Sequence, residues 1–445
     1  MKLFSDPEPY MLCGRETLYL NMKDIKVLAK IFLLTQAKDV ERARFLNSRP
    51  RPKLVNLLSN LWIAESSDAR DVIYGLLNLC SDGRDECLVL DYRNESTTES
   101  LYIKYGELCV QRNEIQEILY LAGIGYPRKL SIPSWSPDWT SIPTVPTLRK
   151  RHYNASGENQ GNFMLVSSTM LSVSAVLVDN IIQIADKAFT SANFTYRSLP
   201  NMSTLAQSRI EVDSQNMAKS LPDEYDGGKH HGLQSRDEAF WRTLIGDTEA
   251  LSSRTHSRTD CTTPTIQSPY NFELRYERPA SPEYGRLFNT ECALRDQRLS
   301  SLTPKSNPAK SKSLWARAQC ESKEDPDLVA AWRRGYQKVP DNPAVILDSD
   351  MRFTDAFVTC ASGRKFAITE NPVTGRKRMA LVPPEAQVGD NVYVIHGMEV
   401  PFVMRRSTNP FPEYWLKMVG ECFVHGIMDG EAVHNGAVTE LIYVY

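Results

Sequence analysis

The sequence has little net charge and lacks the cysteine pairs that mark many stabilised chains. Its 445 residues carry 52 Lys and Arg against 54 Asp and Glu, a formal net charge of -2. A balance so close to zero provides no global field that attracts nucleic acid or an anionic membrane. The nine cysteines include no Cys-x-x-Cys pair. We therefore expect reduced thiols in a cytoplasmic protein rather than a disulfide framework.

The sequence also lacks the motifs of common catalytic sites. No Gly-x-Gly-x-x-Gly loop or Walker-type phosphate loop occurs, which excludes nucleotide binding of those kinds. A Gly-x-Ser-x-Gly nucleophile turn is missing as well. The most apolar stretch, 170–184, contains Asp179 and Asn180 and is too short to cross a bilayer as a helix. We expect a protein with no membrane span and no cofactor that is not an enzyme.

The first 141 residues have the periodicity of a helical block. Apolar residues recur every three or four positions, which places them on one face of each helix. Asp68 can cap the first turn of one helix, and Ser96 and Glu99 have the spacing of a capping box for another. The predicted helices cover 22–34, 53–62, 68–77 and 99–121.

Beyond this block the pattern changes to turns and then to short strands. Two prolines and two tryptophans within 132–139 predict a rigid, packed turn, and alternation over 165–185 predicts one or two strands. The stretch 193–327 is polar apart from the apolar cluster 240–244, which we interpret as a docked helix. The predicted strands that follow are 351–360, 365–369, 391–396, 402–405 and 414–424. The last strand places Leu416, Met418, Gly420, Cys422 and Val424 on one face.

Together these patterns predict an α+β fold in four parts. Residues 1–141 form the helical block, and 142–246 form a mixed α/β continuation that includes the helix at Phe240. Residues 247–326 are a low-complexity, largely disordered insert, because they offer too little apolar surface to offset the entropy of ordering. Residues 327–445 form a small, mostly antiparallel β domain that begins with a short helix over 327–332.

The densest group of candidate metal ligands lies near the carboxyl end. Its spacing matches no zinc pattern, its cysteine falls on the core side of a predicted strand, and its glycines favour a shaped turn. A metal-dependent enzyme or metal-stabilised domain is nevertheless the alternative hypothesis. A separate histidine pair at 230–231 is predicted to be solvated. The candidate ligands are Cys422, His425, Asp429, Glu431 and His434.

Several strings of the sequence occur in an order typical of one family. The most specific is Val-Gly-Glu-Cys-Phe-Val-His-Gly-Ile-Met-Asp-Gly-Glu at 419–431. Others are Asp-Ala-Arg-Asp-Val-Ile-Tyr-Gly at 68–75 and Ile-Pro-Ser-Trp-Ser-Pro-Asp-Trp at 132–139. Shorter strings lie at 12–14, 90–92, 240–244, 357–359, 388–390 and 401–403. Together they resemble the second half of fungal heterokaryon-incompatibility (HET) domain proteins and the carboxyl-terminal region of that family.

The chain departs from the family pattern in two places. Ala69 stands where the family has proline, a change that a helix start tolerates. The Trp-Gly and Cys-Ile-Asn-Gln strings of the family's front half do not occur. The resemblance therefore implies a non-self-recognition protein of fungal cell-death signalling without the effector core, the part that resembles TIR signalling domains. A truncated allele, a gene-model error, a partner that regulates full-length relatives and a non-functional remnant all fit.

The resemblance implies action through contacts with other proteins, full-length HET-type relatives among them, and not with nucleic acid. The helix at 70–74 and the turn at 132–139 would shape one surface, and the hairpin at 420–431 another. The following residues are expected to be structural or partner-binding: Arg70, Asp71, Tyr74, Pro133, Trp135, Pro137, Asp138, Trp139, Gly389, Asp390, Gly420, His425, Gly426, Met428, Asp429, Gly430 and Glu431.

Overall fold

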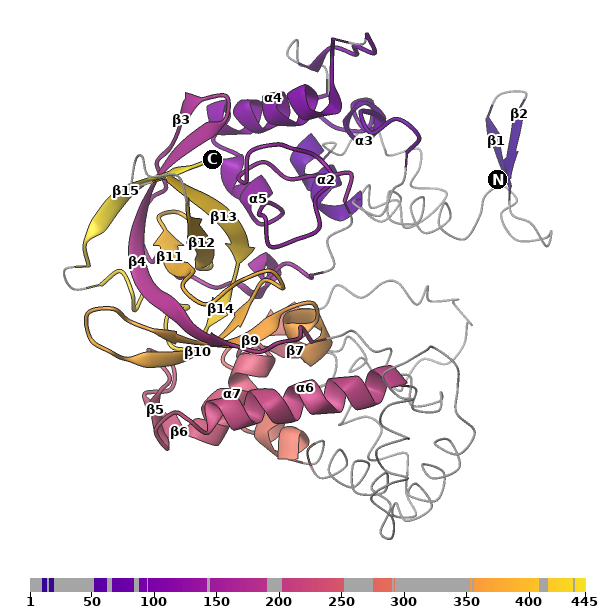
Figure 1. Ribbon diagram of the computed structural model, residues 1–445. Coiled ribbons are helices and arrows are strands. Elements are labelled where there is room, and N and C mark those ends of the chain that lie inside the picture. Colours follow the sequence, from indigo (N-terminus) through magenta and orange to yellow (C-terminus); the bar gives the residue numbers. More distant parts are fainter. Residues whose placement is uncertain are drawn as a thin grey trace, which may run out of the picture.

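The fold is α+β, as predicted, with helices packed around one large sheet that is mostly antiparallel (Figure 1). The predicted helices at 22–34 and 327–332 lie outside the described residues. Within the described part of the chain, no helix combines the length and the apolar composition needed to cross a membrane. The computed structural model describes residues 10–13, 16–19, 52–61, 66–83, 88–93, 95–141, 145–189, 202–251, 275–289, 292, 353, 356–407, 415–434 and 437–445.

The amino-terminal block contains shorter helices than the sequence predicts. The predicted 99–121 helix is broken, because Asn113 has a left-handed φ of 56° that a continuous helix does not accept. The hydroxyl of Thr97, not that of Ser96, accepts the capping hydrogen bond from the Ser100 amide at 3.1 Å. The helices are α2 (Leu54–Leu61), α3 (Asp71–Tyr74), α4 (Thr98–Gln111) and α5 (Ile115–Leu119), and a hairpin of β1 (Tyr10–Cys13) and β2 (Glu16–Tyr19) precedes them.

The turn at 132–139 is packed, as predicted. Trp135 is fully buried, and a Cβ atom on Gly106 of α4 would lie 2.7 Å from its ring. Trp139 meets the Tyr102 ring edge-to-face at 5.0 Å. Asp138 accepts hydrogen bonds from three backbone amides and from the Thr140 side chain. These contacts place both tryptophans in the core, under α4.

Strand β4 organises the large sheet. One of its edges pairs with β3 and β11, and the other pairs with β15 and β9. The order β4-β11-β12-β13-β15 returns to β4 and closes a ring, which β9, β10 and β14 extend (Figure 1). The strands are β3 (Phe163–Ser167), β4 (Met170–Ile184), β9 (Lys365–Glu370), β10 (Lys377–Val382), β11 (Asn391–Ile395), β12 (Phe402–Arg406), β13 (Trp415–Glu421), β14 (Phe423–Val424) and β15 (Thr439–Val444).

The two faces of this sheet carry side chains of different size. Successive residues of a strand point to opposite faces, so β11 directs Val392 and Val394 to one core cluster and Tyr393 and Ile395 to another. The smaller cluster, which we call the enclosed core, is made mainly of Val and Ala and takes residues from β9, β10 and β14 but none from β15. The outer cluster is larger and richer in aromatic residues, and it continues into the helical block. Strands from the predicted regions 142–246 and 327–445 therefore share one sheet and its core.

Two strand predictions were wrong. Residues 356–361 are helical instead of extended, because Phe353, Phe357, Cys360 and Ala361 recur at helical spacing and are all buried. In β13 a register shift lies opposite Val403 and Met404. This bulge sends Leu416 and Met418 to the outer core but Cys422 and Val424 to the enclosed one, not to a single face.

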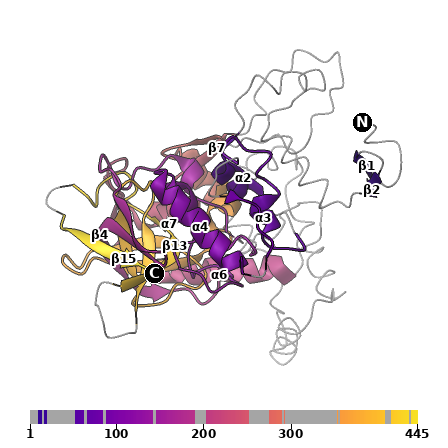
Figure 2. The same ribbon diagram turned by 90° about the horizontal axis from the view of Figure 1, so that it is seen from above.

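A smaller unit packs against β9 and β10 (Figure 1). Figure 2 shows its helices α6 and α7 from above. Its α7 is the helix predicted at Phe240, whose ring lies 5.4 Å from that of Phe366 in β9. Two pieces of the predicted 247–326 insert are folded here, including a helical turn over 283–289, and the rest of that insert lies outside the described residues. The unit contains α6 (Met202–Ala218), β5 (Glu224–Asp226), β6 (Leu233–Ser235), α7 (Arg236–Leu244), β7 (Glu249–Leu251) and β8 (Arg275–Glu277).

Candidate functional site

The 419–431 string begins with a buried ion pair. Glu421 at the end of β13 is 1% exposed, and its Oε1 lies 2.7 Å from Nη2 of the fully buried Arg364. Glu421 also accepts a hydrogen bond of 2.8 Å from the Leu148 amide, next to a 3-10 helix over Arg149–Arg151. Burial raises the pKa of Glu421 to about 7, and the charge of Arg364 opposes that rise. The pair therefore joins the start of β9 to the end of β13 and, through Leu148, to the segment before β3, and the ionised carboxylate depends on Arg364.

His425 follows β14 and is buried against the smaller unit. Its ring stacks on Tyr225 of β5 at 5.5 Å, and its Nε2 makes a short hydrogen bond with the side-chain amide nitrogen of Gln234. Burial lowers the pKa of His425 to about 3. The imidazole is consequently neutral near pH 7, with Nε2 free to accept the Gln234 hydrogen bond.

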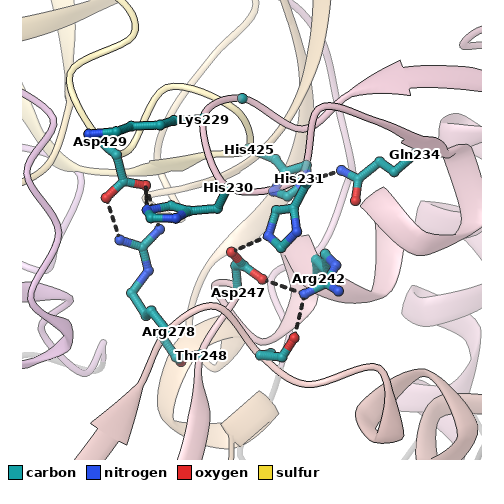
Figure 3. Close-up of polar contacts among 12 residues, drawn as sticks. Lys229, His230, His231, Gln234, Arg242, Asp247, Thr248, Arg278, His425 and Asp429 are labelled. Atoms are coloured by element: carbon teal, nitrogen blue, oxygen red, sulfur yellow. Dashed lines mark hydrogen bonds and ion pairs between the residues drawn. The ribbon is translucent and has the colours of Figure 1, made fainter.

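The acidic residues of the string are paired with groups from the smaller unit (Figure 3). Asp429 accepts two hydrogen bonds from Arg278, at 2.7 and 2.9 Å, and lies 3.4 Å from Nε2 of His230. Glu431 accepts from the backbone amides of Lys229 at 2.9 Å and Asp429 at 2.7 Å. These two carboxylates thus hold the loop at Lys229 and the end of β8 at Arg278, both of which lie far from the string in the sequence.

A second acid centre lies beside them within the smaller unit. Asp247 contacts Nε2 of His231 at 2.7 Å and Nη1 of Arg242 at 2.8 Å, and Arg242 also donates to the Ala280 carbonyl. Burial alone would raise the pKa of Asp247, but the His231 hydrogen bond and the nearby positive charge lower it. The prediction of a solvated pair at 230–231 was wrong for His231, whose side chain is 9% exposed.

The five candidate metal ligands near the carboxyl end do not come together as the alternative hypothesis requires. Cys422 points into the enclosed core, and Asp429 is occupied by Arg278. Among the described residues, no three His, Cys, Asp or Glu side chains converge in a way that could hold a metal ion. A small polar pocket between His230, His231 and Glu431 has room for about one water molecule. The arrangement is that of a junction, with glycine turns and ion pairs locking two parts of the fold together.

Gly426 shows how close this junction is. It has a φ of +89°, and a Cβ atom there would lie 2.9 Å from the carbonyl oxygen of Asp226 in β5. Gly430 also has a positive φ and packs beside Gly157, while Met428 is buried. The glycines of the string therefore permit backbone approaches that larger residues would block.

The other predicted residues lie away from this junction. Asp390 accepts two hydrogen bonds from Arg405 at 2.8 and 2.9 Å, and the Gly389 amide donates to Ile181. Pro133 and Trp135 belong to the buried turn under α4, as do Pro137, Asp138 and Trp139. Gly420 faces the Tyr126 ring. These positions hold neighbouring segments of the backbone together.

The residues at 70–74 lie beneath an exposed apolar segment. Arg70 pairs with Asp68 at 2.7 Å and covers the Tyr92 ring at 5.1 Å. The Tyr92 hydroxyl donates to Asp71 at 2.6 Å, and the buried Tyr74 meets the Tyr92 ring at 5.3 Å. Of the same segment, Val89 is 67%, Leu90 57% and Tyr92 50% exposed. We call Val89, Leu90 and Tyr92 the 89–92 patch.

Sequence reasoning missed the partners of the 419–431 string. Tyr225, His231, Gln234, Asp247 and Arg278 lie in a stretch whose polarity predicts little structure. The one usable signal was the apolar cluster at 240–244, because a docked helix requires ordered segments on either side of it.

Comparisons with known proteins test the resemblance to heterokaryon-incompatibility proteins. Residues 344–444 match the family model of the Het-6 beta-barrel domain. The resemblance to heterokaryon-incompatibility proteins is confirmed. The chain is also 24% identical over 411 residues to heterokaryon incompatibility protein 6, OR allele, of Neurospora crassa. That match covers 85% of this chain and 51% of the relative, so the chain spans about half of the relative's length. No solved structure matches significantly.

The Het-6 match covers β9 to β15 together with the whole 419–431 string. It does not include β4, although β4 pairs with three of those strands and completes the ring. The smaller unit also lies outside the match, yet it supplies Tyr225, Gln234 and Arg278 to the string. The Het-6 region of this chain is therefore completed by earlier segments.

Proposed function

We propose that this chain acts in heterokaryon incompatibility, the recognition of non-self between fused fungal cells, through contacts with other proteins in cell-death signalling. The Het-6 beta-barrel match and the similarity to the Neurospora protein support the cellular role. We place the chain in the cytoplasm and propose that it regulates full-length HET-type relatives and is not an enzyme.

The observation that carries the contact mechanism is the 89–92 patch. Three large apolar side chains within four positions are at least half exposed, and such clusters mark interaction sites on soluble proteins. The patch is also held in place, because Tyr92 bonds to Asp71 and lies under Arg70. A fixed apolar surface binds at a lower cost in conformational entropy than a mobile one.

The residues of the 419–431 string have a supporting role in this proposal. Their side chains are used in the ion pairs and hydrogen bonds of the junction. A partner that reached them would first have to displace the smaller unit. We therefore expect substitutions in the string to act on stability, and substitutions in the 89–92 patch to act on binding.

A binding measurement with purified components tests the contact mechanism. Full-length HET-type relatives from the same organism are titrated against the immobilised chain and its Leu90→Asp variant. Leu90 is 57% exposed, so the change should alter stability by no more than about 0.5 kcal/mol. We expect at least a tenfold weaker interaction. Val373→Asp, at a 90% exposed position in the β9–β10 turn, is the control that should bind normally. Equal binding by both variants would contradict this use of the patch.

A further inference from the structure

The segment 89–92 depends on side chains for its conformation. It belongs to no helix or strand, and within the described part of the chain none of its N–H or C=O groups bonds to another backbone group. A segment of this kind opens easily unless neighbouring side chains hold it. Arg70, Asp71 and Tyr74, at the start of α3 and within it, are the side chains that do so.

Tyr74 holds the middle of the segment. Its hydroxyl accepts a hydrogen bond from the Asp91 amide at 3.3 Å and donates to the Asp91 carbonyl oxygen at 3.4 Å. One buried side chain therefore satisfies both backbone groups of Asp91. The Tyr74 ring also meets the Tyr92 ring edge-to-face, which fixes the direction of the next side chain.

Asp71 and Arg70 hold the carboxyl end of the segment. The Tyr92 hydroxyl donates to Asp71 at 2.6 Å, and this hydrogen bond is the main reason that the pKa of Tyr92 rises to about 12. Nη1 of Arg70 donates to the carbonyl oxygens of Arg93 at 3.2 Å and Ser96 at 2.9 Å. The position of the 89–92 patch is thus set by polar groups that belong to another part of the sequence.

These polar groups lie beneath the patch. Tyr74 is 5% exposed and the Arg70 side chain 17%, whereas Val89 and Leu90 are 67% and 57% exposed. A partner that lies on the patch therefore meets its apolar side chains, while the groups at α3 stay underneath.

We propose that Arg70, Asp71 and Tyr74 are positioning residues, which hold the 89–92 patch in the conformation that a HET-type relative binds and do not contact that relative themselves. The effect on binding rests on the proposed function. The hold on the segment exists in the free chain, so it can be measured without a partner.

Hydrogen exchange in the free chain tests the hold. Tyr74→Phe keeps the buried ring and removes the hydroxyl, so the Asp91 amide should exchange about fivefold faster, the factor that corresponds to one ordinary hydrogen bond. Tyr102→Phe is the matched control, because it removes a hydrogen bond of 2.8 Å to the Ala69 carbonyl and should leave Asp91 unchanged. Unchanged exchange in Tyr74→Phe, or equal acceleration in both variants, would overturn the proposal.

A rescue experiment tests the carboxylate. Asp71→Ala should accelerate exchange across 89–93, whereas Asp71→Asn should restore slow exchange because its side-chain oxygen still accepts the Tyr92 hydroxyl. Tyr92→Phe removes the other partner of the same bond and should add nothing to Asp71→Ala. Additive effects, or no rescue by asparagine, would reject the role of Asp71.

Binding kinetics with the HET-type relative separate positioning from contact. In Asp71→Ala/Tyr74→Phe the binding conformation is less populated, so association should slow at least threefold with unchanged dissociation. Leu90→Asp removes a contact and should accelerate dissociation. Faster dissociation alone in the double variant would make these residues contact residues and contradict the proposal. A wild-type chain that binds no relative would overturn the proposed function, whereas the exchange rates would still decide the positioning.

Discussion

Acid should weaken this fold through His425. Burial lowers its folded pKa to about 3 from a reference value of 6.5. Between these values the unfolded chain binds a proton at His425 that the folded chain does not bind, so the stability contributed by this residue falls as pH falls through this window. At about 1.4 kcal/mol per pKa unit, the contribution of His425 to the free energy of unfolding should fall by about 2 kcal/mol between about pH 7.5 and about pH 5.

Urea denaturation at the two pH values measures this loss, and His425→Phe isolates it. The phenylalanine ring retains the stacking on Tyr225 but leaves the Gln234 amide without its partner, which costs about 1–3 kcal/mol near neutral pH. Because the variant has no imidazole to protonate, its stability deficit should shrink by about 2 kcal/mol at the lower pH.

Ile427→Val provides the matched control for this experiment. Ile427 is 1% exposed in the same turn, and removing a methyl group there should cost about 0.5–1.5 kcal/mol at every pH. A His425→Phe curve that runs parallel to the wild-type curve, as the control should, would refute the reasoning.

Four further substitutions should each lower the free energy of unfolding, which urea denaturation measures. Glu421→Leu should cost about 3–5 kcal/mol because it leaves the Arg364 charge buried and unpaired. Arg364→Met should cost less, since Glu421 can take up a proton, and equal losses would contradict this asymmetry. Gly426→Ala should cost about 1–3 kcal/mol through its positive φ and the Asp226 carbonyl, and a neutral effect would exclude the close approach. Trp135→Ala should cost about 3–5 kcal/mol. A loss of stability as small as that at an exposed position would contradict the burial of its ring.

Local periodicity was sufficient to predict much of the fold. The β-branched runs at 365–369 and 391–396 became β9 and β11, and the cluster at 240–244 became α7. The failures came from features that depend on distant contacts. A left-handed Asn113 ends α4 early, and a bulge in β13 redirects every later side chain of that strand. Strand β15 was missed because its pairing with β4 joins segments that are remote in the sequence.

The 419–431 string could be found from the sequence, but its chemistry could not. Five potential metal ligands within one short stretch suggested coordination as an alternative. Arg278 argues against coordination, because the fold brings it from a polar segment of the sequence to Asp429. A pairing between segments so far apart depends on the topology of the sheet and the smaller unit, which one sequence does not reveal.

The proposed role rests most directly on the effect of this chain in living hyphae. The chain and its Leu90→Asp variant are expressed in a fungal host, alone and beside a full-length HET-type relative, and viability is scored against an empty vector. We predict no effect of either chain alone, and altered cell death only when wild-type chain and relative are expressed together. Death caused by the chain alone, or an identical response to the Leu90→Asp variant, would contradict the account.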